Sequence, residues 1–171
     1  TFSTENWKRT ADEVGFLMNL IKTHLRAEFE YYKKEQVRVT WIGDIDGLPV
    51  EIQKDLISIR EESKSFSGLT LVFAINYGGR DEIIRAINKS KNMDENITIE
   101  NFSSFFDTPD LPDADLIIRT GGEKRLSNFL MWHSAYSEFE FVDTLWPDYT
   151  PAEFNKSLIE FQNRTRRFGG L

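Results

Sequence analysis

Residues 69–84, LTLVFAINYGGRDEII, contain the pattern that decides the fold class. The apolar and β-branched run from Leu69 to Asn76 predicts a buried strand, and Gly78 and Gly79 end it. Asp81 then begins a helical pattern. A strand without polar alternation that leads directly into a helix is typical of a parallel sheet covered by helices.

The same alternation of strand and helix continues in both directions along the chain. Helices are expected over 10–34, 49–63 and from 150 onward, and both Thr10 and Thr150 begin segments of capping-box form. Further strands are expected over 37–42, 115–119 and 139–142, and Ser127 is expected to cap a short helix. We therefore predict an α/β fold as one domain over residues 1–171, with a mainly parallel sheet and helices on both faces. Ligands of such sheets bind beyond the carboxyl ends of the strands.

Composition restricts the function classes. Lys and Arg number 21 against 28 Asp and Glu, a net charge of −7, which argues against nucleic acid as a partner. The chain contains no cysteine, which excludes disulfides, a thiolate nucleophile and cysteine-ligated zinc, and which fits a reducing, cytoplasmic compartment. No apolar run reaches the roughly 18–20 residues of a membrane span.

The segment 119–125, RTGGEKR, concentrates positive charge at the end of an expected strand. The segment contains three basic residues, Arg119, Lys124 and Arg125, and one acidic residue, Glu123. Its local charge is therefore +2 in an acidic chain. The glycine pair would let the backbone approach a ligand, and the helix expected from Ser127 would add free N–H groups. These features predict a phosphate or diphosphate site, and a solvated turn with basic residues is the alternative.

Two more clusters are candidates for binding. The segment 3–9, STENWKR, is too polar for a core and too aromatic for a plain linker, so we interpret it as a site. Arg164, Arg166 and Arg167 precede a second glycine pair, where cations can also simply complement the dipole at a helix C-terminus.

Five segments together resemble the cis-prenyltransferase family, in particular its bacterial branch that makes undecaprenyl diphosphate. They are TFSTENWKR (1–9), NYGGRDEI (76–83), DLIIRTGGEKRLSNFLMWHSAYSEFEF (115–141), LWPDY (145–149) and RRFGG (166–170). The resemblance implies an enzyme that condenses isopentenyl diphosphate onto an allylic diphosphate, usually farnesyl diphosphate, with cis double bonds. The long product would be the lipid carrier of cell-wall synthesis. The family's other implied properties are Mg²⁺ as cofactor, a homodimer, and peripheral membrane contact through the lipid product.

The resemblance also assigns roles to individual residues. Arg119, Arg125 and Ser127 would bind the isopentenyl diphosphate, and Glu138 would bind its Mg²⁺. Guanidinium groups pair with phosphate oxygens and a carboxylate suits a hard cation, so we expect these four side chains to converge at one rim of the sheet. Lys124 replaces a histidine found in some relatives.

The allylic substrate and the partner subunit involve the two ends of the chain. Asn6 would assist removal of the proton that creates the new alkene. Arg167 and Gly169 would reach into the site of the partner subunit. The residues expected around the allylic substrate are Ser3, Glu5, Trp7 and Arg9.

The product must occupy an apolar tunnel, for which one face of the strand at 69–76 is the candidate wall. We expect Leu69 to limit product length, so that Leu69→Ala gives longer products. The family's first strand, with its His-x-x-x-x-Met-Asp-Gly-Asn-x-Arg-Trp segment, is not in this sequence. We therefore expect an N-terminally incomplete domain and negligible turnover by residues 1–171 alone.

Two other functions compete with chain elongation. A non-catalytic subunit could dimerise with an active synthase and bind diphosphate, although it would have no need for a complete diphosphate and metal site. A generic nucleotide-binding domain would require a G-x-G-x-x-G turn, which the sequence lacks.

Overall fold

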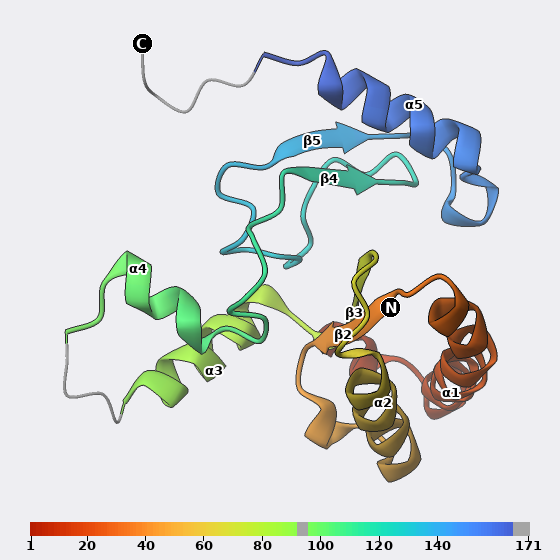
Figure 1. Cartoon of the computed structure of the whole chain (residues 1–171), viewed down its shortest axis with the longest axis vertical. Helices are drawn as coiled ribbons and strands as arrows, with labels where there is room; N and C mark the ends of the chain where they lie inside the picture. Colours follow the sequence, from red (N-terminus) through yellow and green to blue (C-terminus); the bar gives the residue numbers. More distant parts are fainter. Residues whose placement is uncertain (92–95, 166–171) are drawn as a thin grey trace. The chain divides into compact units, whose positions relative to one another are not determined.

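The computed structural model describes residues 1–91 and 96–165, and the chain divides into two compact units, Thr1–Asp110 and Leu111–Leu171. Figure 1 labels the longer elements of both units. The first unit contains β1 (Phe2–Ser3), α1 (Ala11–Lys34), β2 (Arg38–Ile42), α2 (Val50–Ser63), β3 (Thr70–Tyr77), α3 (Gly79–Ser90) and α4 (Ile99–Phe102). The second contains β4 (Leu116–Arg119), β5 (Glu138–Phe141) and α5 (Pro151–Gln162). Four short 3-10 helices, η1 (Thr4–Lys8), η2 (Ile45–Gly47), η3 (Ser103–Phe105) and η4 (Trp146–Asp148), lie between these elements.

The sheet of the first unit is parallel, with strand order β1-β3-β2. Strand β3 is central, and Ile42 at the end of β2 is paired with Ala74. Ser3 at the end of β1 is paired with Tyr77. The carboxyl ends of all three strands therefore meet at one edge, which also carries η1 and the loop after β2.

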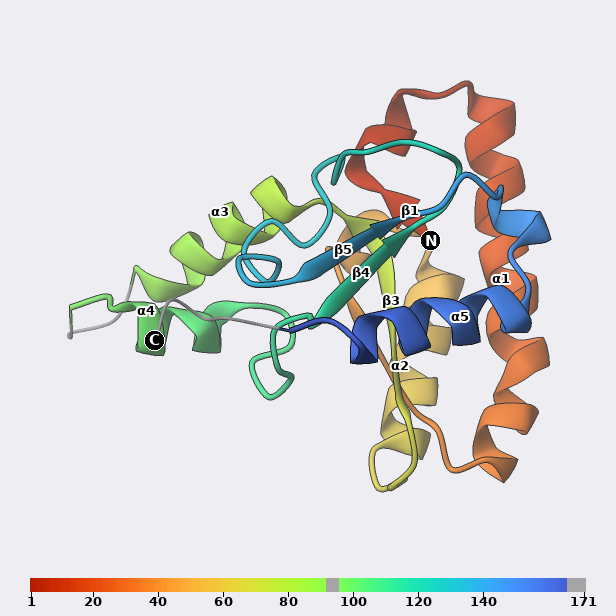
Figure 2. The same ribbon diagram turned by 90° about the horizontal axis from the view of Figure 1, so that it is seen from above.

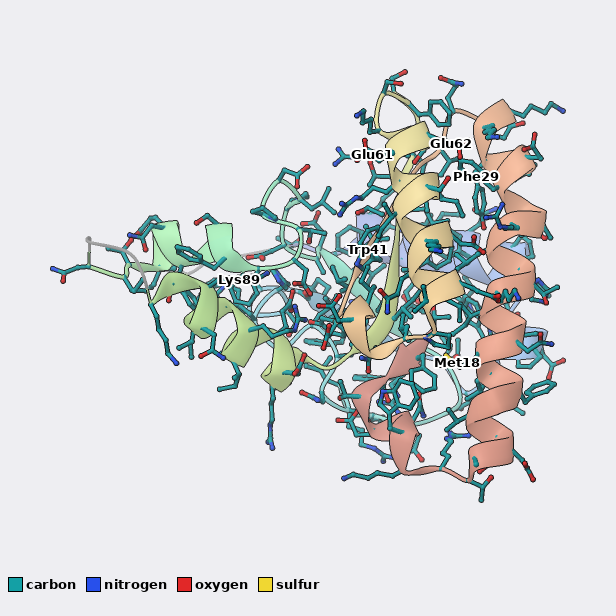
Figure 3. All side chains as sticks on the ribbon, turned by 90° about the horizontal axis from the view of Figure 1, so that it is seen from below. Met18, Phe29, Trp41, Glu61, Glu62 and Lys89 are labelled. Atoms are coloured by element: carbon teal, nitrogen blue, oxygen red, sulfur yellow. The ribbon has the colours of Figure 1, made fainter. Side chains whose placement is uncertain are left out.

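Helices α1 and α2 bury one face of this sheet. Val39 and Trp41 of β2 pair with Leu71 and Phe73 of β3, so these side chains share the face that packs against the helices. Met18 and Phe29 lie on the side of α1 that faces α2 (Figure 3). The fully buried members of this core include Phe2, Ile52, Leu56, Ile75 and Val39. Both long helices thus lie on the same face, where their apolar stripes form one core with the sheet.

The predicted caps are present. Thr10 accepts a hydrogen bond from the Glu13 amide, and the Glu13 carboxylate accepts one from the Thr10 amide at 3.2 Å. Thr150 and Glu153 do the same at the start of α5, where the Thr150 amide donates at 2.8 Å. These reciprocal bonds satisfy amides that a helix start leaves open, so each helix begins where the sequence predicted.

The second unit has its own parallel sheet. Strands β4 and β5 pair from Leu116↔Glu138 to Arg119↔Phe141. Helix α5 runs beside these two strands (Figure 2), and Ser157 on it donates a 2.6 Å hydrogen bond to Glu140. Because paired residues point to the same side of a sheet, Glu138 and Glu140 face α5, while Ile117, Arg119, Phe139 and Phe141 face away from it.

The α/β class with parallel strands is confirmed, and two local predictions are wrong. No helix begins at Ser127. Ser127, Asn128 and Leu130 have φ of 48°, 65° and 45°, a left-handed backbone that cannot continue an α-helix. Leu69 precedes β3 and is 69% exposed, so it is not part of the buried face proposed as the tunnel wall. None of the helices within the described ranges is both long and apolar enough to cross a membrane.

Candidate functional site

Arg119 and Ser127 are joined directly in the second unit. Arg119 is the last residue of β4, and its Nη1 donates a 2.9 Å hydrogen bond to the Ser127 hydroxyl. The same nitrogen donates to the backbone carbonyl of Arg125. The guanidinium group therefore holds the 125–127 turn against the end of the strand and brings Arg119 and Ser127 into contact.

The glycine pair has a different role from the one predicted. Gly121 and Gly122 have φ of 86° and 74°, which a glycine adopts at little cost. Their amides donate to the carbonyls of Thr144 and Val142 at 2.9 and 3.0 Å. Both N–H groups are occupied, so the pair fastens the loop to the segment after β5 and does not supply amides to an anion. With the helix at 127 also absent, anion binding in this loop depends on side chains.

A cavity of about 220 Å³ lies beside Arg119. Arg119 and Arg125 bring two guanidinium groups to its lining, and the exposed Arg125 also forms an ion pair with Glu123. The remaining lining is apolar, with Ile117, Ile118, Leu126, Phe129 and Phe141. A cavity lined by two cationic residues and several apolar ones suits a small amphipathic anion.

Glu138 does not join this cluster, so the predicted convergence of all four side chains is wrong within one chain. The register pairs Glu138 with Leu116, three residues before Arg119, or about 10 Å along the strand. Its side chain also faces α5, on the opposite side of the sheet from Arg119. There Glu138 accepts a 3.2 Å hydrogen bond from Arg164, whose other nitrogen lies 3.8 Å from Glu140.

The resemblance implies a Mg²⁺ site that uses the Glu138 carboxylate. Glu138 offers the hard oxygen atoms that Mg²⁺ prefers. The carboxylate and the Arg119 cluster nevertheless lie on opposite faces, so within one chain they do not hold the same diphosphate and metal. Across residues 1–91 and 96–165, no group of three or more acidic, histidine or cysteine side chains is placed to bind a metal ion.

The second candidate segment lies at the carboxyl edge of the first unit's sheet. The Asn6 side-chain oxygen accepts bonds from the Ser3 amide at 2.7 Å and the Ser3 hydroxyl at 3.2 Å. Asn6 and Ser3 thus meet, and the Asn6 oxygen closes the turn of η1. Glu5 and Arg9 are exposed at the surface, and Arg9 lies 3.9 Å from Glu13.

Trp7 extends this segment onto the sheet. Its indole nitrogen donates a 2.7 Å hydrogen bond to Asn76 at the end of β3, and its ring packs edge-on against Phe2 with centroids 4.9 Å apart. Trp7 remains 40% exposed, so part of the ring is open to a ligand. The sequence placed Asn76 in a strand-end motif but did not identify this bond, because the two residues are 69 positions apart.

A partly buried ion pair lies at the same edge of the sheet. Arg85 donates a 2.7 Å hydrogen bond to Asp107, which also accepts a 2.8 Å bond from the Gly43 amide. Burial opposes ionisation of Asp107, but the bonds from Arg85 and Gly43 outweigh it and hold its pKa below the usual value. Neither residue was identified as functional from the sequence, since nothing in the pattern links α3, residue 107 and the end of β2.

The predicted tail residues Arg167 and Gly169 lie outside the described residues. Arg164, the first cation of that cluster, is described, and it bonds to Glu138 and to the carbonyl of Phe139 at 3.1 Å. It therefore belongs to the packing between α5 and β5.

Comparison with known proteins identifies the family. A family model described as putative undecaprenyl diphosphate synthase matches residues 1–169. An isoprenyl transferase of Treponema denticola is 52% identical over 170 residues, an alignment that covers 98% of this chain and 74% of the relative. The ditrans,polycis-undecaprenyl-diphosphate synthase ((2E,6E)-farnesyl-diphosphate specific) of Micrococcus luteus is 45% identical, with 99% and 71% covered.

A solved structure agrees with these relatives. The crystal structure of a probable undecaprenyl diphosphate synthase from Campylobacter jejuni matches with a TM-score of 0.92 and 40% identity, covering 99% of this chain and 80% of that one. The strand-end guanidinium cluster and the indole-bearing turn lie in the segments that carried the sequence resemblance. The chain belongs to the undecaprenyl diphosphate synthase family of prenyltransferases.

Proposed function

We propose that this protein elongates a cis-polyprenyl chain by condensing isopentenyl diphosphate onto an allylic diphosphate, farnesyl diphosphate, to give undecaprenyl diphosphate. The observation that carries the proposal is the cavity lined by Arg119 and Arg125, with Ser127 bonded to Arg119 at its edge. Guanidinium groups offer the paired N–H donors that phosphate oxygens accept. The apolar wall, which includes Leu126, Phe129 and Phe141, suits the five-carbon group of isopentenyl diphosphate.

The allylic diphosphate is assigned to the other segment. Trp7 presents a partly exposed aromatic ring beside Asn6 at the sheet edge, which suits an unsaturated hydrocarbon chain. Ser3, Glu5 and Arg9 complete this segment by resemblance. Asn6 is proposed to assist proton removal; its side-chain oxygen accepts hydrogen bonds from the Ser3 amide and the Ser3 hydroxyl, and it must release one of them before it can accept a hydrogen bond from another group.

The remaining assignments are also proposals. Mg²⁺ is the proposed cofactor and would supply charge neutralisation of a diphosphate group. The resemblance proposes Glu138 as its ligand, although within one chain Glu138 does not face the diphosphate cluster of Arg119. Arg167 and Gly169 would serve the site of a second subunit in a homodimer. The cysteine-free composition supports a cytoplasmic location, and a lipid product would bring the enzyme into peripheral contact with a membrane.

An assay with labelled isopentenyl diphosphate, farnesyl diphosphate and Mg²⁺ tests the activity on the whole natural polypeptide that carries this sequence. We expect a long polyprenyl diphosphate as the product. Arg119→Ala should raise the KM for isopentenyl diphosphate at least about 100-fold, since it removes a charged hydrogen-bonding group from a phosphate site.

Lys124→Ala is the matched control for that variant. It removes one positive charge from the same loop, but Lys124 does not line the cavity. If Lys124→Ala raised the KM for isopentenyl diphosphate as much as Arg119→Ala, Arg119 would act only through its contribution to the positive charge of the loop. Absence of product from the whole polypeptide would favour the non-catalytic subunit, for which the comparisons offer no support.

A further inference from the structure

Asn76 is buried at the point where the central strand of the first unit ends. Its side chain uses both ends of its carboxamide: Oδ1 accepts from the Trp7 indole at 2.7 Å, and Nδ2 donates to the Asp44 carbonyl at 2.7 Å. An indole N–H can only donate and a carbonyl can only accept, so these partners fix the orientation of the amide. Asn76 is only 6% exposed, so it has little water to replace a lost partner.

The backbone at this position selects the same residue. Asn76 has a φ of 49°, a left-handed conformation that asparagine tolerates better than most residues. Its carbonyl accepts a 3.2 Å hydrogen bond from the Asp44 amide. The approach is close, because a Cβ atom on Gly43 would lie 2.0 Å from the Ile75 carbonyl oxygen. Glycine could adopt this φ but has no carboxamide, so asparagine alone satisfies the backbone and makes both side-chain bonds.

The bond to Trp7 fixes the position of the segment above the strand ends. One edge of the indole is held by Asn76 and one side packs against Phe2, while 40% of Trp7 stays exposed. Trp7 adjoins Asn6, and the turn that carries both is closed by the bond from the Ser3 amide to Asn6. The pairing of β1 with β3 anchors the start of this turn, and the bond to Asn76 fixes the orientation of its Trp7 end relative to the sheet.

We propose that Asn76 is a positioning residue for the allylic substrate: its buried carboxamide ties the Trp7 indole to the Asp44 peptide and so holds residues 3–9 in their binding position. The inference rests on the proposed function of that segment. Asn76 does not need to touch substrate, because it acts through Trp7.

Kinetics of three variants in the whole natural polypeptide test the proposal. Asn76→Asp is nearly isosteric and can still accept from Trp7, but as a carboxylate it cannot donate to Asp44. Asn76→Ala loses both bonds, and Trp7→Phe keeps an aromatic ring without the N–H donor. We expect Asn76→Ala to raise the KM for farnesyl diphosphate about tenfold, with the KM for isopentenyl diphosphate changed less than about twofold.

The double variant Trp7→Phe/Asn76→Ala separates positioning from general damage. Its effect on the farnesyl diphosphate KM should be smaller than the product of the two single effects, because both remove the same bond. Ser63→Ala is the matched stability control: Ser63 is fully buried and accepts a 2.9 Å bond from the Val39 amide, away from the site. An equal KM effect from Ser63→Ala, or equal effects of Asn76→Ala on both substrates, would overturn the proposal.

Hydrogen exchange of the indole N–H groups gives a readout that does not depend on turnover. The chain has four tryptophans, and Trp7→Phe identifies which indole signal in a ¹⁵N correlation spectrum belongs to Trp7. That signal should be protected from exchange in the unmodified protein and lose protection in Asn76→Ala. Protection that persists in Asn76→Ala would refute the positioning of Trp7 by Asn76. An inactive polypeptide with a protected Trp7 indole would refute the proposed function alone.

Discussion

At the scale of single residues, the charged side chain of Asp107 has a structural role in the first unit. Asp107 is 10% exposed and binds both the Arg85 guanidinium and the Gly43 amide. It thereby connects α3 to the end of β2, next to the Asn76 bonds. The pair is partly buried, and each partner has a second ion pair, Arg85 with Asp81 and Asp107 with Lys89, so loss of the Asp107 charge weakens this network without leaving Arg85 unpaired.

Asp107→Asn tests this connection through its dependence on pH. The pKa of Asp107 is lowered in the folded state, so its contribution to stability is fully present above the unfolded value, about 3.9. That contribution is lost as pH falls through the lower folded pKa. We expect Asp107→Asn to reduce the free energy of unfolding by about 1.5 kcal/mol at neutral pH, because Arg85 keeps its ion pair with Asp81.

Urea unfolding between pH 7 and pH 2 measures the effect. The difference between the two proteins should shrink at the acidic end, where Asp107 becomes protonated in both states. Asp81→Asn is the control, because Asp81 is the more exposed partner of Arg85 at 41%. A difference that stays constant over the whole range would mean that the charge of Asp107 is unimportant.

At the scale of elements, the backbones of β2 and β3 stay in close contact beyond their last paired residues. Pairing of the two strands ends at Ile42 and Ala74, and the chains then stay in contact through Gly43, Asp44 and Asn76. Gly43 has a φ of 112° and no room for a side chain, so this strand end tolerates only glycine. The close approach brings the loop after β2 under Trp7.

Gly43→Ala and Gly15→Ala should have opposite effects on stability. The Gly43 change forces a Cβ against backbone and is expected to cost roughly 3 kcal/mol. A Cβ on Gly15 in α1 would meet nothing within 4 Å, so Gly15→Ala should stabilise by about 0.5–1 kcal/mol. Thermal unfolding of both variants decides the point, and equal melting temperatures would contradict the proposed strain.

At the scale of the whole molecule, each unit carries one candidate substrate segment on a parallel sheet. The first unit offers Trp7 and Asn6 at its carboxyl edge, and the second offers the Arg119 cluster at the end of β4. A chain of net charge −7 can therefore still bind diphosphates, because its cations are concentrated locally. Binding of two diphosphates increases negative charge, for which a divalent cation is the usual compensation.

Removal of divalent metal should stop turnover. We expect excess EDTA to reduce activity to background, and added Mg²⁺ to restore it fully. Glu138→Gln should raise the Mg²⁺ concentration needed for half-maximal activity about tenfold, whereas Lys156→Gln on the exposed side of α5 should not change it. Undiminished turnover in EDTA would refute the metal requirement, and an unchanged Mg²⁺ dependence would remove Glu138 as the ligand.

The α/β class, the main strands, the capped starts of α1 and α5, and the cationic loop after Arg119 could all be predicted from the amino-acid pattern. These features depend on local propensity and on side chains within a few positions of one another. The three-dimensional packing was needed to show that Glu138 lies on the other face from Arg119, that the glycine amides are occupied, and that Trp7 bonds to Asn76. The reason is that strand register follows from packing of the whole unit, which no local pattern encodes. The same holds for contacts between distant residues, such as Gly43 with Asp107, 64 positions apart, and Trp7 with Asn76, 69 positions apart.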